Sequence, residues 1–320
     1  MMASILIPCY NAERWIGQCI ESAIEQTWPD KEIIIVDDGS TDRSLEIIKG
    51  FGGHIRWETG PNRGGNATRN RLLELARGEW LQYLDADDYL LSDKIGPQME
   101  VPAERSEADI IFSPVYWEDE VSGRRTLVEV PEPNDLWVLL ARWQMPQTGG
   151  FLWRKQAIVD VGGWKPGQPC CQENELLLRL MMAGRRFVYV DHAGAVYRQW
   201  GEHTVCKRNR PEVHQQRLEI ERRAEEWLRP RGQLTPERLD AINQSRFEVA
   251  RMVWQYDRGF AASVVKTIKA SLPGFVPRGG AAPSGYQRVF RLLGFRMAEH
   301  LASLRRKFSH TSMRESYHSN

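Results

Sequence analysis

The sequence predicts an α/β fold in which a mostly parallel sheet is flanked by helices, with a C-terminal helical extension. Candidate strands such as Lys31–Val36 (KEIIIV) are apolar throughout their cores rather than on one face only. Amphipathic segments such as Ala12–Gln26 lie between them, with isoleucines four residues apart. Strands that are buried on both faces and alternate with helices are typical of parallel sheets. After about Pro211 only helical segments are expected.

Each element follows from local pattern and turn residues. The expected strands are Ser4–Pro8, Lys31–Val36, His54–Glu58, Glu79–Leu84, Asp109–Phe112, Phe151–Trp153, Arg186–Val190 and Ala195–Gln199. A hairpin is expected near Ser122–Gly123. The expected helices are Ala12–Gln26, Thr41–Gly50, Gly64–Arg77, a short helix ending at Val161, Gln172–Ala183, Glu212–Arg229, Pro236–Asp257, Phe260–Leu272 and Tyr286–Phe308, the last broken at Gly294.

Charge divides the chain in two. The net charge is +1, but residues 205–320 hold 22 Lys and Arg against 11 Asp and Glu, so residues 1–204 carry −10. Such asymmetry between halves suggests parts with different partners. We expect a catalytic domain at 1–210, a helical extension at 211–273, and a linker, a basic amphipathic helix and a disordered tail at 274–320.

Cysteine usage and hydropathy indicate a cytoplasmic protein. The five cysteines are Cys9, Cys19, Cys170, Cys171 and Cys206, a sparse odd set that does not suggest a disulfide framework or a zinc site. The N-terminus lacks the pattern of a signal peptide, and no window of ~18 apolar residues predicts a spanning helix.

Three polar segments follow successive expected strands, and ligands of open α/β sheets bind outside the carboxyl ends of strands. Asp85-Ala86-Asp87-Asp88 offers carboxylates that can share a hard divalent cation with substrate phosphates. The alternative for this cluster is an acidic turn and helix N-cap. Asp37-Asp38-Gly39-Ser40 can accept hydrogen bonds from a base or a ribose, or form a turn. The segment from Asn62 to Asn70 is a glycine-rich helix entry, but it does not match a P-loop.

The ordered set of these motifs resembles the nucleotide-sugar-binding half of family 2 glycosyltransferases over roughly residues 3–200. The set comprises Pro8-x-Tyr10-Asn11, Val36-Asp37-Asp38-Gly39-Ser40, Asn62-x-Gly64, Arg69-Asn70, Gly78-Glu79-Trp80 and Leu84-Asp85-Ala86-Asp87-Asp88. The resemblance implies a GT-A fold, Rossmann-like in its nucleotide-binding half, and an inverting transfer reaction. It also implies a divalent metal, Mn²⁺ or Mg²⁺.

The resemblance assigns roles to individual residues. Asp37 or Asp38 contacts the nucleoside, most often uridine, and Arg69 lies beside the base and phosphate. Asp85 touches the ribose or the metal, and Asp87 touches the metal. The remaining expected nucleotide-site residues are Pro8, Tyr10, Asn11, Asn62, Gly64 and Ala86.

The resemblance also locates the general base at the start of a late helix. In Gln172-Glu173-Asn174-Glu175-Leu176, Glu173 occupies the position of the family aspartate and Arg179 that of the family arginine. This chain departs from the pattern, with Glu for Asp and Gln172 for Glu. The alternatives are that Glu175 is the base, or that both glutamates only complement the helix dipole. Gln147-Thr148-Gly149-Gly150 either lines the acceptor side or turns the chain, and His203 is a further candidate beside the metal or diphosphate.

The expected partners are a nucleotide-sugar donor and a glycan or lipid-linked acceptor, with no nucleic acid. A sugar-1-phosphate nucleotidyltransferase and a non-catalytic binding protein on the same fold are the alternative functions. The apolar stripe of Tyr286–Phe308 comprises Tyr286, Phe290, Leu293, Met297 and Leu301, and arginines surround it. It is interpreted either as a contact with the inner face of an anionic membrane or as a docking face for protein. The donor sugar, the acceptor and the oligomeric state stay open.

Overall fold

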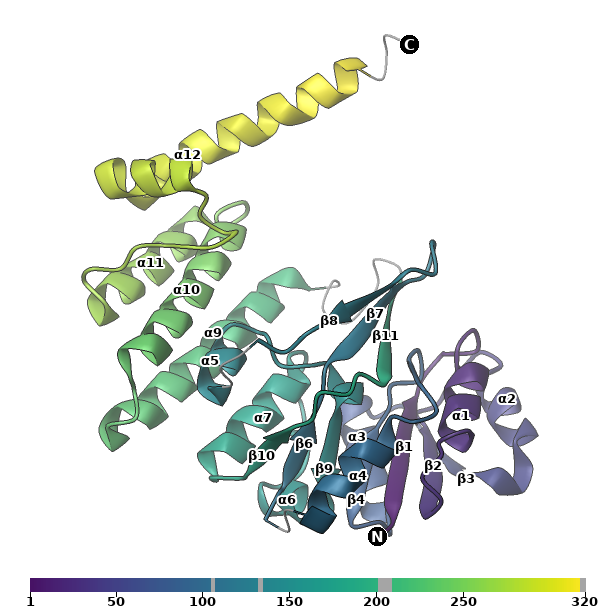
Figure 1. Ribbon diagram of the computed structural model, residues 1–320. Helices are drawn as coiled ribbons and strands as arrows, with labels where there is room; N and C mark the ends of the chain where they lie inside the picture. Colours follow the sequence, from purple (N-terminus) through teal and green to yellow (C-terminus); the bar gives the residue numbers. More distant parts are fainter. Residues whose placement is uncertain (105–106, 132–134, 201–208, 317–320) are drawn as a thin grey trace. The chain divides into compact units, whose positions relative to one another are not determined.

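The computed structural model describes residues 1–104, 107–131, 135–200 and 209–316 (Figure 1). The chain forms two compact units. The sheet unit comprises Met1–Asn134 and Gln144–Arg210, and the helical unit comprises Asp135–Trp143 and Pro211–Asn320. Residues 135–143 thus belong to the helical unit although they lie inside the expected 1–210 segment. The functional roles given to the three expected segments stay predictions.

The sheet unit is built on a seven-stranded sheet in the order β10-β6-β9-β4-β1-β2-β3. Its strands are β1 Ala3–Cys9, β2 Lys31–Asp37, β3 Arg56–Thr59, β4 Trp80–Tyr83, β6 Ile110–Phe112, β9 Phe151–Arg154 and β10 Phe187–Tyr189. Only β9 runs against its neighbours β4 and β6; the other pairs are parallel. The prediction of a mostly parallel sheet is confirmed.

Helices cover this sheet because its central strands are apolar on both sides. The helices of the unit are α1 Ile16–Ile24, α2 Ser44–Gly50, α3 Gly65–Leu75, α4 Ile95–Glu104, α6 Lys155–Asp160 and α7 Gln172–Met182. Alternate residues of β1 and β2 share one core cluster with α1, α2 and α4, while the intervening Leu6 and Ile34 are buried as well. Burial on both faces explains the continuous apolar runs of the sequence.

A second, four-stranded sheet in the order β5-β11-β7-β8 was not predicted. Its strands are β5 Tyr89–Leu90, β7 Val115–Asp119, β8 Arg125–Val128 and β11 Ala195–Gln199. The hairpin expected near Gly123 is confirmed, because β7 and β8 pair antiparallel across a turn in which Gly123 has a φ of 65°. β5 begins directly after Asp88, so the C-terminal end of the acidic segment Asp85–Asp88 continues into this small sheet.

The helical unit contains α5 Leu136–Ala141, α9 Arg210–Leu228, α10 Pro236–Val253, α11 Arg258–Ser271 and α12 Ser284–Ser316. Figure 1 shows α10 and α11 side by side, and they pack against one another. The break at Gly294 is confirmed, since this residue has a φ of 77° inside α12. In the described part of the chain, no helix has both the length and the apolar content that crossing a bilayer requires.

Phenylalanine 247 lies at the centre of the core of the helical unit. Its ring contacts Phe275, Tyr286, Phe290 and Phe295 at centroid distances of 5.5–6.0 Å. Large aromatic side chains supply most of such a small core. The expected linker and the first turns of α12 therefore contribute buried side chains to the fold of this unit.

Candidate active site

The sheet brings the polar segments after β1, β2 and β4 to one edge, because these three strands are neighbours and run the same way. Cys9 pairs with Asp37, and Leu6 pairs with Tyr83, at the carboxyl ends of the strands. The first two loops are also joined directly. The backbone N–H of Asn11 donates to Ser40 Oγ (2.9 Å), and the N–H of Thr41 donates to Asn11 Oδ1 (2.8 Å). Tyr10, in the first of these loops, is 52% exposed, and Pro8 is half-buried.

The carboxylates of Asp37 and Asp38 organise the loops around them. Asp37 accepts a hydrogen bond from the Thr59 hydroxyl at 2.6 Å. Asp38 accepts the backbone N–H groups of Arg63 (2.8 Å) and Gly64 (2.9 Å), one on each oxygen. Both aspartates are buried, whereas Asn62 and Gly64 are exposed. The pair therefore fixes the glycine-rich loop before α3 at the same edge of the sheet.

Glycine 39 is required where these two loops meet. It has a φ of 74°, and a Cβ atom on it would lie 2.9 Å from the backbone nitrogen of Asn62. Only glycine adopts this backbone at so close an approach without strain. The turn after β2 and the loop at 60–64 are thus in backbone contact.

Arginine 69 joins the acidic segment to the start of α7. Its Nη2 donates to Asp85 Oδ1 (2.7 Å), its Nη1 donates to Gln172 Oε1 (2.8 Å), and its guanidinium lies 4.9 Å from the ring centroid of Trp164. The side chain is buried, which by itself lowers its pKa, but the charges of Asp85 and Glu173 outweigh burial and raise it. One fixed cation thus pairs with the predicted metal ligand Asp85 and interacts electrostatically with the predicted base Glu173.

The segment Asp85–Asp88 concentrates negative charge that the protein does not fully neutralise. Asp87 Oδ2 accepts from the indole N–H of Trp200 (2.8 Å), and Asp88 Oδ1 accepts from the backbone N–H of Arg198 (2.9 Å). Burial, followed by the charge of Asp85, raises the pKa of Asp87. Burial and both neighbouring aspartates raise the pKa of Asp88 well above its ordinary value. Ala86 lies in the apolar core, so its side chain anchors the segment.

These residues fit a divalent metal that substrate oxygens help to hold. The described residues contain no group of three His, Cys, Asp or Glu side chains arranged around a metal. Asp85 and Asp87 are two carboxylates at one edge, with a surplus of negative charge that a cation would offset. Mg²⁺ is often bound by one or two carboxylates together with substrate phosphates.

Arg198 and Trp200 are site neighbours that the sequence interpretation missed. Arg198 Nη1 donates to the carbonyl oxygen of Asp87 (2.7 Å), and its guanidinium lies 4.6 Å from the Trp15 ring centroid. The available signal was the polar and aromatic run Tyr197–Trp200 at the end of an expected strand. His203, the further candidate beside the metal or diphosphate, lies outside the described residues.

Glu173 and Glu175 have different surroundings although both lie in the first turn of α7. Glu173 is half-buried and accepts a hydrogen bond from Thr148 Oγ1 at 2.7 Å. Glu175 is only 2% exposed, and its Oε2 lies 2.7 Å from Arg179 Nη2. Thr148 belongs to the segment 147–150 that was expected on the acceptor side. Glu173 therefore has the accessibility that a base requires, and Glu175 is held in an ion pair.

The tryptophans and cysteines near the site are buried in the core. Trp153 and Trp164 are fully buried, and Trp164 packs edge-on against Tyr83 at 5.2 Å. Burial, with a smaller contribution from Asp37, raises the pKa of the Cys9 thiol to about 12, and burial raises that of Cys19 well above its ordinary value. These two thiols are not nucleophiles at neutral pH.

Comparison with known proteins identifies the family. The sequence profile described as "Glycosyl transferase family 2" matches residues 4–163, half of the chain. The poly(ribitol-phosphate) beta-glucosyltransferase of Bacillus spizizenii is 42% identical over 102 residues, which is 30% of this chain and 16% of that protein. Two other curated relatives are matched over 41% and 37% of their own length, so the similarity spans less than half of each.

Solved structures show the same fold at low sequence identity. S. aureus TarS 1–349, in complex with UDP-GlcNAc, has a TM-score of 0.58 and 16% identity, covering 88% of this chain and 95% of that chain. The mannosyltransferase PcManGT from Pyrobaculum calidifontis, in complex with GDP-Man and Mn²⁺, has a TM-score of 0.53 and 15% identity, covering 94% and 86%. The expected GT-A fold is confirmed, as is the expectation of a glycosyltransferase over a nucleotidyltransferase. The chain belongs to glycosyltransferase family 2.

Proposed function

We propose that this glycosyltransferase moves a sugar from a nucleotide-sugar donor, expected to be a UDP-sugar, to a hydroxyl group of a saccharide or lipid-linked glycan. The transfer is a single displacement that inverts the anomeric centre. The observation that carries the proposal is the position of Arg69. Its guanidinium bonds Asp85, on the donor side, and Gln172, next to the candidate base Glu173. A donor and an acceptor can therefore meet beside one cation.

The donor's nucleotide lies along the loops after β1 and β2 in this proposal. Asp37 and Asp38 retain acceptor capacity beyond the hydrogen bonds they already make, because each carboxylate oxygen has two lone pairs. Tyr10 presents an exposed ring beside them, on which a base can pack. The proposal is supported by the neighbours of similar fold, one bound to UDP-GlcNAc and the other to GDP-Man.

The acceptor reacts on the side of α7. Glu173 takes the proton of the attacking hydroxyl group, and the oxygen of that hydroxyl forms a bond to the anomeric carbon. The bond from that carbon to the diphosphate oxygen breaks, and its electron pair leaves with the nucleoside diphosphate. The Thr148 hydroxyl, hydrogen-bonded to Glu173 Oε1, orients the carboxylate. A positioned base of this kind contributes ~10²–10⁴-fold in rate.

Asp85 and Asp87 would hold a divalent metal, Mn²⁺ or Mg²⁺. Such an ion would neutralise part of the negative charge that develops on the departing diphosphate. The raised pKa of Asp87, caused by burial and by Asp85, supports a cation at this place. A structural neighbour was crystallised with Mn²⁺. Arg69 adds a second, permanent positive charge on the donor side.

The test is Glu173→Gln, which keeps the shape of the side chain and removes the base. We expect donor binding, measured as the rise in melting temperature with UDP-sugar and Mn²⁺, to be unchanged. Turnover should fall about 10²–10⁴-fold. Glu175→Gln is the matched control, since it changes the same residue type one half-turn away. It should lower stability through loss of the Arg179 pair and leave turnover per folded molecule near normal. Near-normal turnover by Glu173→Gln would remove Glu173 as the base.

Contact with a membrane surface through α12 is a further part of the proposal. The stripe expected over Tyr286–Phe308 is divided in the fold. Tyr286 and Phe290 are buried. The exposed stripe consists of Leu293, Met297, Leu301 and Leu304, each of which is 40–57% exposed. Arg288 and Arg291 are exposed before the kink at Gly294, and Arg296 is exposed after it. An exposed apolar stripe among arginines suits an anionic bilayer surface.

Removing α12 would expose the core of the helical unit, so point variants are the better test. Leu301→Gln with Leu304→Gln makes the exposed stripe polar without touching buried residues. We expect the affinity for vesicles of phosphatidylglycerol and phosphatidylcholine, measured by co-sedimentation, to fall about 30-fold, in line with ~2 kcal/mol for two leucine side chains partly withdrawn from lipid. Undiminished co-sedimentation would count against the contact.

A further inference from the structure

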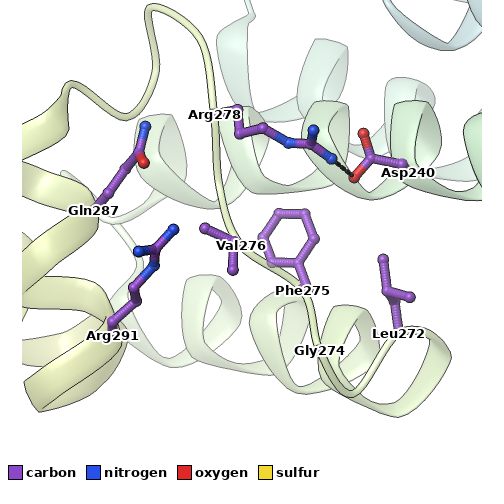
Figure 2. A pocket seen from close by; sticks show the side chains of 8 residues that line it. All are labelled: Asp240, Leu272, Gly274, Phe275, Val276, Arg278, Gln287 and Arg291. Atoms are coloured by element: carbon purple, nitrogen blue, oxygen red, sulfur yellow. Dashed lines mark hydrogen bonds and ion pairs between the residues drawn. The ribbon is translucent and has the colours of Figure 1, made fainter.

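The helical unit contains a cavity of about 360 Å³ that no part of the glycosyl-transfer chemistry uses. It lies between the loop 274–278 and the first turns of α12, and Figure 2 shows the side chains around it. Arg278 and Arg291 line it together with Gln287, while Leu272, Phe275 and Val276 give it apolar walls. The cavity is small and concave, and charged and polar side chains make up most of its accessible lining, so it is a candidate site for a polar ligand.

The loop that forms one wall is fixed in place by hydrogen bonds. Gln244 Nε2 donates to the carbonyl oxygen of Val276 (2.9 Å), and the backbone N–H of Arg278 donates to Gln244 Oε1 (2.9 Å). Phe275 is buried against Phe247, with ring centroids 5.7 Å apart. The packing of Phe275 and the side-chain amide of Gln244 hold this loop in place, so the cavity is a fixed part of the helical unit.

The charges around the cavity favour an anion. Arg278 Nη2 donates to Asp240 Oδ1 (2.8 Å), and the same oxygen accepts from Gln244 Nε2 (3.2 Å), so Asp240 is already neutralised. Arg291 is exposed, and within the described residues it has no ion pair or hydrogen bond. Figure 2 shows the Arg291 guanidinium extending from α12 toward Val276. The cavity thus holds two guanidinium groups against one carboxylate.

We propose that this cavity binds a phosphate group, with Arg291 as its principal ligand and Arg278 as a second. A guanidinium offers paired N–H donors that match two phosphate oxygens. The apolar walls accept the carbon-bearing part of a phosphate ester. Leu292 and Leu293, 81% and 57% exposed, follow Arg291 directly. The phosphate can be carried by a lipid head group or by a soluble ester, and these two sources are separable by experiment.

The test compares four forms of the full-length chain: the wild type, Arg291→Gln, Arg288→Gln and Val276→Trp. Arg288→Gln is the matched control, because it removes one exposed arginine from the same helix outside the cavity. Val276→Trp fills the cavity without changing charge. Calorimetric titration with inorganic phosphate and with glycerol phosphate should give equal affinity for the wild type and Arg288→Gln. Arg291→Gln and Val276→Trp should bind at least 10-fold more weakly. Equal affinity in all four forms would overturn the proposal.

Vesicles then identify the source. If the phosphate belongs to a lipid, Arg291→Gln should weaken co-sedimentation with phosphatidylglycerol vesicles several-fold more than Arg288→Gln does. If the source is soluble, the two variants should lose vesicle binding equally while differing for glycerol phosphate. Neither measurement needs a sugar donor or acceptor, so failure of the proposed transfer reaction would leave this result unaffected. The exposed-stripe variant Leu301→Gln/Leu304→Gln should still bind soluble phosphate, which separates the cavity from the membrane contact.

Discussion

Two acidic pairs at the same edge of the main sheet have opposite electrostatic situations. Asp37 and Asp38 follow β2, are buried, and receive hydrogen bonds from Thr59, Arg63 and Gly64 on their carboxylate oxygens. Asp85 and Asp87 follow β4 and receive one side-chain donor each from within the sheet unit. The first pair is held by neutral donors of its own loops, whereas the second lies in a run of three carboxylates of which Asp85 pairs with Arg69.

The difference teaches that an acidic doublet after a strand has no fixed role. Asp38 accepts the backbone N–H groups of Arg63 and Gly64 and thereby fixes the loop at 60–64. In the Asp85–Asp88 segment, like charges and burial act together and raise the pKa of Asp87. Carboxylates in that state are stabilised by a cation. The comparison therefore favours loop organisation by the first pair and supports the proposed metal binding by the second.

The largest expected effect on activity is that of replacing Asp87, one of the two proposed metal ligands. Asp87→Asn keeps the contact with Trp200 possible but removes one of two ligand charges. We expect kcat/KM to fall on the order of 10³-fold, since charge stabilisation by a metal is worth several kcal/mol. Mn²⁺ should also cease to raise the melting temperature in the presence of UDP. A variant that still shows full Mn²⁺ dependence of both quantities would contradict the metal assignment.

Arg69→Lys should give the next largest effect, because it keeps the charge and removes the fork. A lysine can reach Asp85 or Gln172 but not both, so the link between the donor side and α7 is lost. We expect turnover to fall about 10²-fold, with each lost charge-assisted hydrogen bond worth ~1.5–3 kcal/mol. Steady-state kinetics give the value. If Arg69 acts by joining the two sides, a Gln172→Ala substitution should cost much less in the Arg69→Lys background than in the wild type.

Asp38→Asn tests the role of the first acidic pair, Asp37 and Asp38. Asparagine has one oxygen in place of two, so one of the hydrogen bonds from Arg63 and Gly64 is lost. We expect the KM for the donor to rise about 10-fold with kcat nearly unchanged, which corresponds to ~1.4 kcal/mol of lost binding. The Mn²⁺ concentration at half-maximal activity should not move. A shift in that concentration as large as the one caused by Asp87→Asn would show that the two acidic pairs share a role.

The sequence predicted the elements that have a local signal, and it carried no signal for features that tertiary pairing decides. The parallel sheet followed from apolar runs such as that of β2, because burial on both faces leaves no alternation. β5 is only two residues long, so the second sheet had no local signal. Its effect on the site is large, since β11 places Arg198 and Trp200 on the acidic segment.

Similar limits apply to the candidate base and to the terminal helix. The family register of Gln172–Arg179 placed Glu173 at the base position and left Glu175 as the alternative. The ion pair of Glu175 with Arg179, which separates the two glutamates, is set by packing. The apolar stripe of α12 was correct as a helical pattern. Its division into buried Tyr286 and Phe290 and an exposed remainder depends on the kink at Gly294 and on the core around Phe247.

Glu221, a buried acid of the helical unit, provides the smallest and most specific test of the comparison. It is 1% exposed and accepts from Ser245 Oγ at 2.5 Å, and burial raises its pKa to about 7 from an ordinary value of 4.5. Between these two values the folded state binds more protons than the unfolded state, so the stability contributed by this group is complete below about pH 4.5 and is lost as the pH rises through 7. Glu221→Gln should therefore gain stability relative to the wild type between pH 5 and pH 8, on the order of 1 kcal/mol, or a few degrees in melting temperature. Mn²⁺ should leave this difference unchanged, because Glu221 belongs to the helical unit and is not one of the proposed metal ligands. An unchanged difference would show that a raised carboxyl pKa alone does not mark a metal ligand in this protein, whereas a Mn²⁺-sensitive difference would contradict the assignment of Glu221 as a structural acid.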